Sequence, residues 1–237
     1  KIKLFTFPNI LTLCNLLCGA GATVAALRYG DLFWPLVLIV TAAVFDFLDG
    51  FAARLLKSYS PLGKELDSLA DCISFGMAPA AVLLNVYYAA GGEGLWGYSV
   101  FVLAAFSALR LAKFNIDENQ TTQFIGLPSP ASALLVAASG YLVGTGQYAV
   151  GPWFAVGLAA VLSYLLVCNV PMFALKFKHY GFRGNEVRYI FAVCALLSAG
   201  AAMLTGSAVP ALSVAGGFGL AYVAVSLAVR AACFRKS

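Results

Sequence analysis

Long segments without charged residues constrain the fold of this chain more than any other feature. No Asp, Glu, Lys or Arg lies between Lys3 and Arg28 or between Glu118 and Lys176. A helix needs about 20 mainly apolar residues to cross a bilayer. Because 62% of the residues are hydrophobic and only 11% are charged, the sequence predicts a polytopic membrane protein and excludes an ordinary soluble domain.

The apolar runs predict an all-α bundle. At about 20 residues per span we expect about eight transmembrane helices, all held in one membrane domain over residues 1–237. The expected spans are approximately 8–28, 32–57, 62–88, 95–115, 128–145, 150–170, 186–206 and 209–230.

The basic residues predict the orientation, because short loops rich in Lys and Arg stay on the cytoplasmic side. Of the 15 Lys and Arg residues, all except Arg28 map to one side of the eight-helix arrangement. Both termini and the segment from Asp46 to Asp71 are therefore predicted to be cytoplasmic. The net charge of +5 is interpreted as attraction to anionic lipid headgroups, and no nucleic-acid partner is expected.

Four carboxylates interrupt this apolar chain at the predicted turn between the second and third spans. Asp46 and Asp49 are three residues apart on one helix face, and Asp67 and Asp71 are four residues apart on the next helix. An unpaired charge in a membrane core costs about 2.5–3.5 kcal/mol on insertion scales, so these acids need a partner. Oxygen ligands without His or Cys suit a hard cation such as Mg²⁺, Mn²⁺ or Ca²⁺.

Small residues and one cation accompany the acids. Gly50 and Ala53 share the face of the first pair and leave room for a bulky group near the backbone. Arg54 follows one turn after Gly50, where it can meet an anion held by a metal. Gly63 and Ser74 lie on the same face of the third span as the second pair of acids.

Other polar residues in the apolar spans have two interpretations each. Asn9, Thr12 and Asn15 recur on one face of the first span and either line a polar cavity or bond neighbouring helices. Arg110, three residues before Lys113, is either an anchor at the membrane surface or an anion ligand. The loop from Lys176 to Arg188 gathers further cations, as topological signals or as a wall for an anionic substrate.

Written as a pattern, the acidic segment is D-x2-D-G-x2-A-R-x8-G-x3-D-x3-D, from Asp46 to Asp71. This pattern resembles the signature of the CDP-alcohol phosphatidyltransferases, integral enzymes that move a phosphatidyl group from a CDP-activated lipid to an alcohol. Within that family the flanking segments are similar to those of the phosphatidylserine synthases. These segments are Pro8 to Asn15, Asp71 to Pro79, Arg110 to Asn115 and Phe124 to Ala131.

The resemblance implies a catalytic core over about residues 8–206, in a cell (inner) membrane of prokaryotic type. The substrates would be CDP-diacylglycerol and L-serine, among membrane lipids, and a homodimer is possible. Two divalent ions, Mg²⁺ or Mn²⁺ with Ca²⁺ as a possible occupant, would be held by Asp46, Asp49, Asp67 and Asp71. Asp71 would also act as the base that accepts the proton of the alcohol.

The resemblance also implies two binding regions around the acids. The CDP-lipid would be bound by Asn9, Thr12, Asp49, Gly50, Ala53, Arg54 and Gly63. Serine would be bound by Arg110, Lys113 and Asn115, with Ser74 and Asn15 as weaker candidates.

Two alternatives stay open at this point. A sister enzyme could use glycerol 3-phosphate, an inositol derivative or another alcohol, with cations from the loop between Lys176 and Arg188. Outside enzymes, the acids could form a cation pathway in a transporter or a structural Ca²⁺ site. Against a transporter, the two halves of the chain show no matching pair of interrupted helices.

Overall fold

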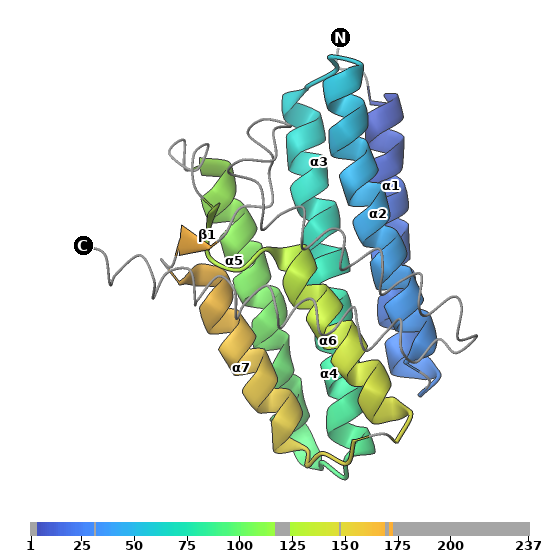
Figure 1. Ribbon diagram of the computed structural model, residues 1–237, viewed down its shortest axis with the longest axis vertical. Coiled ribbons are helices and arrows are strands. Elements are labelled where there is room, and N and C mark those ends of the chain that lie inside the picture. The colour runs from blue at the N-terminus through green and yellow to red at the C-terminus, as the bar shows by residue number, and fades with distance from the viewer. Residues whose placement is uncertain (1–3, 31, 117–123, 147, 169–170, 173–237) are drawn as a thin grey trace, which may run out of the picture.

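The computed structural model describes residues 4–30, 32–116, 124–146, 148–168 and 171–172. These residues form a bundle of roughly parallel and antiparallel helices, in which α1, α2 and α3 lie together and α5 and α7 lie on the opposite side (Figure 1). The elements are α1 (Phe7–Arg28), α2 (Phe33–Leu55), α3 (Pro61–Asp71), the π-helix η1 (Cys72–Met77), α4 (Ala78–Ala89), the 3-10 helix η2 (Gly94–Phe101), α5 (Val102–Ile116), β1 (Phe124–Ile125), α6 (Ser129–Gly144), α7 (Trp153–Val167) and β2 (Pro171–Met172).

The observed helices follow the first six expected spans closely. Four continuous helical stretches in the described part are long and apolar enough to cross a membrane, namely Phe7–Arg28, Phe33–Leu55, Pro61–Ala89 and Gly94–Ile116. The helices α6 and α7 are apolar but shorter. The chain is therefore a helical membrane protein. The spans expected at 186–206 and 209–230 lie outside the described residues.

Local sequence signals explain where α3 begins. Lys57 takes a positive φ of 49° after α2, and the chain then extends to Ser60, whose side chain accepts a hydrogen bond from the backbone N–H of Gly63 at 3.0 Å. Pro61 occupies the first helical position, where its missing N–H costs nothing. Ser60 is thus the N-cap of α3, and this tight connection makes α2 and α3 an antiparallel hairpin.

The core of the bundle surrounds α4. Almost every residue of this helix is buried, and it packs against α1, α6 and α7. Gly140 of α6 permits the approach, because a Cβ there would lie 2.4 Å from a methyl group of Val82. The second half of the Pro61–Ala89 stretch thus packs against the other helices, while its first half carries Asp67 and Asp71.

A short antiparallel pair, β1 with β2, is the one non-helical regular element in the described residues. It joins the segment before α6 to the segment after α7 (Figure 1). Gly126 follows β1 with a φ of 81°, and a Cβ there would meet the carbonyl oxygen of Leu166 at 2.5 Å. The tight turn that leads into α6 thus depends on a glycine.

Candidate metal centre and adjoining cavity

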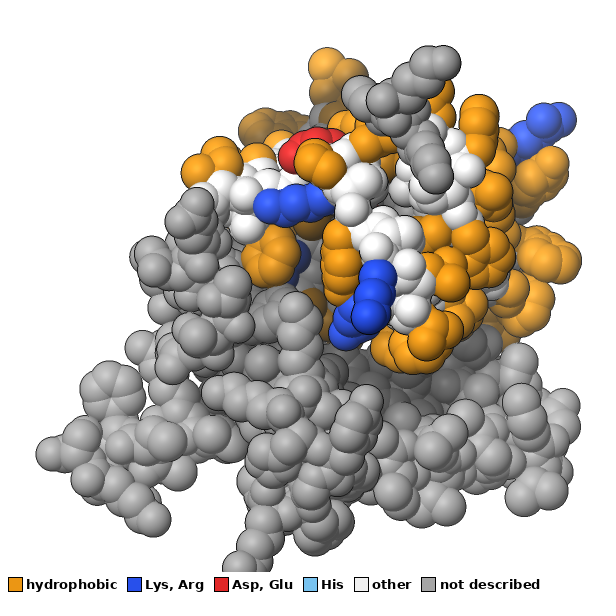
Figure 2. Space-filling model, turned by 90° about the horizontal axis from the view of Figure 1, so that it is seen from above, with side chains coloured by type: hydrophobic (Ala, Val, Ile, Leu, Met, Phe, Trp, Pro, Cys, Tyr) orange, Lys and Arg blue, Asp and Glu red, His pale blue; other side chains and the backbone are white. Residues whose placement is uncertain are grey.

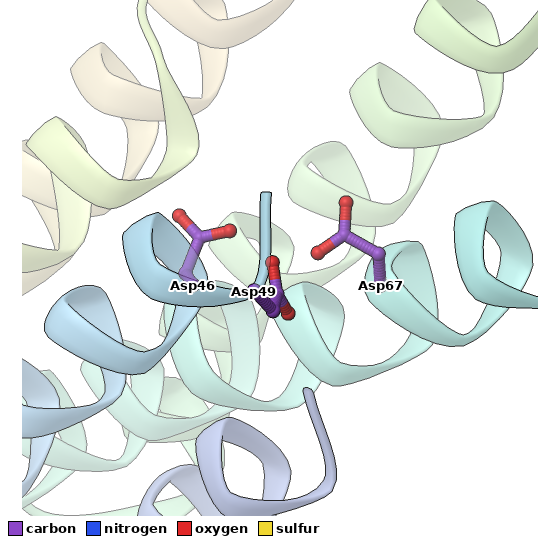
Figure 3. A group of neighbouring side chains, drawn as sticks. All are labelled: Asp46, Asp49 and Asp67. Carbon is purple, nitrogen blue, oxygen red and sulfur yellow. The ribbon is translucent and has the colours of Figure 1, made fainter. Parts of the chain in front are cut away.

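The α2–α3 hairpin brings three of the four predicted acids together. Asp46, Asp49 and Asp67 each offer a carboxylate oxygen, and these atoms all lie within 4.8 Å of one another. Asp46 and Asp49 come from α2 and face Asp67 on α3 (Figure 3). The spacing along each helix and the antiparallel turn are sufficient to produce this group.

The hydrogen-bond partners that the described part of the chain provides for these acids are neutral side chains. Asp67 is half-buried, and its Oδ1 atom is buried without a hydrogen-bond partner in the described structure. An uncompensated buried carboxylate is costly, so a group of three oxygen donors fits a hard divalent cation.

Helix α1 supplies neutral hydrogen-bond donors to two of the four carboxylates, Asp49 and Asp71. The hydroxyl of Thr12 donates to Oδ2 of Asp49 at 2.5 Å, and the side-chain amide of Asn15 donates to Oδ1 of Asp71 at 3.1 Å. Both donors are buried. Asp71 is buried as well, and it is not a member of the close group of three.

A cavity of about 480 Å³ adjoins the acids, between α1 and the α2–α3 hairpin. Its volume lies within the range of small-molecule sites. It is lined by Pro8, Asn9, Thr12, Asp49, Gly50, Ala53, Ser58, Tyr59, Ser60, Pro61, Gly63, Lys64 and Asp67. Every residue predicted to bind the CDP-lipid is in this lining except Arg54, which is exposed and donates from Nε to the carbonyl oxygen of Gly50 at 2.9 Å.

Sequence reasoning missed two residues of this lining that carry chemistry. Lys64 follows Gly63 directly and is the one Lys or Arg among the lining residues, and Tyr59 adds an exposed aromatic ring beside the cap at Ser60. Both residues lie in or just after the turn between the two pairs of acids, and this position in the sequence could have indicated that they line the site. Figure 2 looks onto the end of the molecule at which α2 ends and α3 begins, and Lys and Arg side chains stand out there among apolar ones.

The residues predicted to bind serine lie in different environments. Arg110 is buried and donates from Nη1 to the hydroxyl of Ser129 at 3.0 Å, across the α5–α6 interface. Lys113 is exposed. Asn115 connects α5 to α3 by two hydrogen bonds. Its side-chain amide donates to the hydroxyl of Ser68 at 2.8 Å, and its backbone carbonyl oxygen accepts from Nζ of Lys64 at 3.0 Å.

Ser74 and Asn15 contact each other through a hydrogen bond. The hydroxyl of Ser74 donates to the backbone carbonyl of Asn15 at 2.9 Å, and both residues are fully buried. Their predicted contact with serine stays a prediction, and the structure shows a helix-packing contact. The loop from Lys176 to Arg188 lies outside the described residues.

Fold and site together define a class: a helical membrane protein with a carboxylate group at one end of the bundle and a cavity of small-molecule size beside it. The chain belongs to the CDP-alcohol phosphatidyltransferase family, whose model matches residues 5–165. The matched range contains the whole α2–α3 hairpin and the cavity.

Several relatives carry the name CDP-diacylglycerol–serine O-phosphatidyltransferase. The protein of Bacillus subtilis (strain 168) is 32% identical over 174 residues, which cover 73% of this chain and 90% of the relative. That of Helicobacter pylori (strain J99) is 35% identical over 172 residues, covering 70% and 71%. That of Methanocaldococcus jannaschii is 32% identical over 196 residues, covering 83% and 84%.

Proposed function

We propose that this chain transfers the phosphatidyl group of CDP-diacylglycerol to the hydroxyl of L-serine, giving phosphatidylserine and CMP. The observation that carries the proposal is the group formed by Asp46, Asp49 and Asp67 at the wall of the cavity. Family membership supports the reaction type, and the printed names of the relatives support serine as the alcohol.

Asp46, Asp49, Asp67 and Asp71 would hold the divalent ions, which we propose to be two Mg²⁺ or Mn²⁺ ions; Ca²⁺ also fits oxygen ligands. Bound there, such ions neutralise phosphoryl charge and stabilise the attacking and leaving oxygens. Gly50, next to Asp49, has no side chain that would fill the space where a diphosphate must approach.

The transfer is a direct displacement at the phosphorus that bears the diacylglycerol. The serine hydroxyl oxygen forms the new bond to this phosphorus, and the bond to the CMP oxygen breaks. Asp71 accepts the hydroxyl proton, and CMP leaves with the bonding electron pair. The acyl chains stay in the bilayer, so the site has to lie close to the membrane surface.

Arg110 is our candidate for binding the serine carboxylate. It is a buried cation near the site end of α5, and its hydrogen bond to Ser129 restricts its guanidinium group. Lys113 and Asn115 follow on the same helix end. A guanidinium group can bind a carboxylate with two parallel hydrogen bonds, which a lysine cannot do.

We further propose the membrane arrangement. The full chain would form one domain of eight spans over residues 1–237, with both termini and the acidic hairpin on the cytoplasmic side of a prokaryotic-type inner membrane. The distribution of Lys and Arg along the chain supports this orientation. A second copy of the chain is a possible partner.

The test is CMP release by the purified protein in detergent, with CDP-diacylglycerol as donor. We expect release to require both L-serine and Mg²⁺ or Mn²⁺, and to stop when a chelator is added. A panel of glycerol 3-phosphate, myo-inositol and inositol phosphate tests the alternative alcohols. Release with one of these and not with serine would contradict the choice of serine, and cation flux into vesicles without CMP release would contradict an enzyme.

A further inference from the structure

The amide of Asn15 lies where helix α1 meets the end of α3. Its side chain is fully buried, and Nδ2 donates to Oδ1 of Asp71 at 3.1 Å. We infer that Asn15 is a positioning residue, which holds one oxygen of Asp71 so that the other oxygen is presented to the reacting hydroxyl. This inference rests on the proposed function, because it gives Asp71 the role of proton acceptor.

The position of Asn15 is fixed independently of Asp71. The hydroxyl of Ser74, in η1, donates to the backbone carbonyl of Asn15 at 2.9 Å. Gly19 lets the two helices approach, since a Cβ there would lie 2.2 Å from Oγ and 2.5 Å from Cα of Ser74. The backbone of α1 is thus bonded to the segment that directly follows Asp71, and the amide of Asn15 has little freedom to move relative to this carboxylate.

Position along α1 separates Asn15 from the cavity. Asn9 and Thr12, on the same helix face, line the cavity, whereas Asn15 lies further along the helix and is not among the lining residues. Asn15 therefore acts on the reaction through Asp71.

The amide also carries a cost that packing alone does not explain. Its Oδ1 atom is buried and has no hydrogen-bond partner in the described part of the chain. A buried acceptor without a partner costs about 1–3 kcal/mol, and a leucine of similar size would avoid this cost. Retaining an amide here makes sense if its N–H group is needed by the carboxylate.

A carboxylate bonded through one oxygen is restricted in rotation, and catalytic groups need this restriction to keep productive geometry. Removing an outer hydrogen-bond partner of a site typically reduces affinity or activity about 10–100-fold. For Asn15 we expect the loss mainly in kcat, because its amide contacts Asp71, the proposed proton acceptor. The close group of Asp46, Asp49 and Asp67 stays intact and can still hold the ions.

The experiment compares Asn15→Leu and Asn15→Ala with the parent protein, each as the full chain in detergent. Leucine keeps the volume and removes the donor, and alanine removes the donor without risk of overpacking. The matched control is Thr23→Val on the same helix, since the Thr23 hydroxyl only bonds the carbonyl of Gly19 within the helix at 3.0 Å. The measurements are kcat, the KM for each substrate, Mn²⁺ affinity by equilibrium binding without substrate, and the melting temperature.

We expect kcat to fall about 10–100-fold in both Asn15 variants, while the Mn²⁺ dissociation constant and the KM for CDP-diacylglycerol change less than about threefold. Thr23→Val should keep parental values. Unchanged kcat in either folded variant would overturn the inference. So would weakened Mn²⁺ binding with kcat restored at saturating Mn²⁺, because Asn15 would then act on the metal centre. If the parent releases no CMP with any alcohol, the proposed function itself fails.

Discussion

At the scale of single residues, the four acids differ in the hydrogen bonds that their carboxylates accept. Asp49 and Asp71 each accept a hydrogen bond from α1. Asp46 and Asp67 make no side-chain hydrogen bond within the described structure, although they belong to the close group of three. The two carboxylates without donors are therefore the ones whose charge most needs a bound cation.

Asp67→Asn tests this difference. We expect CMP release to fall about 100-fold or more, because a ligand is lost as well as its charge. The melting temperature without metal should stay or rise, since the neutral amide removes an uncompensated buried charge. Activity and thermal unfolding of the same preparation provide the measurement.

Glu65→Gln is the matched control for Asp67→Asn, because Glu65 is an exposed acid two residues away on the same helix. Glu65→Gln should change neither CMP release nor the melting temperature. Substantial turnover in Asp67→Asn at saturating Mg²⁺ would show that Asp67 is not a ligand.

Arg110→Lys tests the serine site. Lysine keeps the positive charge but loses the planar group that bonds Ser129 at 3.0 Å. We expect the KM for serine to rise about tenfold or more, with a smaller change for CDP-diacylglycerol, in steady-state assays that vary each substrate. Arg28→Lys, at the exposed far end of α1, is the control. Equal changes for both substrates would make Arg110 a structural residue or a phosphate ligand.

At the scale of elements, the contact of α1 with η1 sets the geometry between the donors and the acids. This contact is possible because Gly19 has no side chain. A Cβ at residue 19 would lie only 2.5 Å from the backbone Cα of Ser74. Ser74 then bonds the carbonyl of Asn15. A single residue without a side chain thus decides how closely α1 approaches the helix that carries Asp71.

Gly19→Ala should therefore destabilise the protein. Overpacking of this kind typically costs about 1–3 kcal/mol, and we expect a lower melting temperature and reduced CMP release. In Gly21→Ala on the same helix, the new Cβ would meet only a methyl group of Leu38 at 3.5 Å, so both values should stay near the parent's. Thermal unfolding in detergent followed by tryptophan fluorescence compares them, and equal melting temperatures would refute the packing argument.

Much of this arrangement could be predicted from the sequence, because hydrophobic length and turn signals act locally. The expected span at 8–28 corresponds to α1 at Phe7–Arg28, and the expected span at 62–88 corresponds to the helical stretch Pro61–Ala89. The spacing of the acids along two helices predicted a group of four carboxylates, of which the structure brings three within 4.8 Å of one another.

The rest depends on tertiary contacts that no local pattern encodes. The π-helical turn after Asp71 has no signature in Cys72–Met77. The sequence left open whether Asn15 lines a cavity or bonds another helix, and only packing showed the bond to Asp71. Likewise, the hydrogen bond that connects Lys64 to Asn115 joins residues far apart in the chain.

At the scale of the whole molecule, the two ends of the bundle differ in chemistry. The acids and the cavity lie at the end where α2 and α3 connect. Aromatic side chains gather at the other end, where the rings of Tyr87 and Trp96 each lie within 6.5 Å of the ring of Trp153. Such aromatic groups are typical of a membrane–water interface, which supports a bundle that crosses the bilayer with its site at one surface.

Cysteine labelling tests the proposed orientation. Glu65 is exposed at the site end and Glu93 is exposed at the aromatic end. With a membrane-impermeant maleimide, Glu65→Cys should be labelled in inverted vesicles and Glu93→Cys in right-side-out spheroplasts, above the signal of the parent's own cysteines. The opposite result would reverse the topology, and labelling of both from one side would contradict a spanning bundle.

The π-helical turn at Cys72–Met77 has a consequence for the helical register of the Pro61–Ala89 stretch. A π turn holds one residue more than an α turn, and such turns are rare and frequently found at functional sites. Each residue of an α-helix advances the rotation by about 100°, so the extra residue changes the relative rotation of α3 and α4. In the continuous stretch Pro61–Ala89, Asp67 and Asp71 can therefore face α1 and α2 while the residues of α4 stay packed in the core. Deleting one residue of Cys72–Met77 would rotate α3 relative to α4 by about 100°. Either the acids would then turn away from α1 and α2, or the residues of α4 would lose their packing in the core.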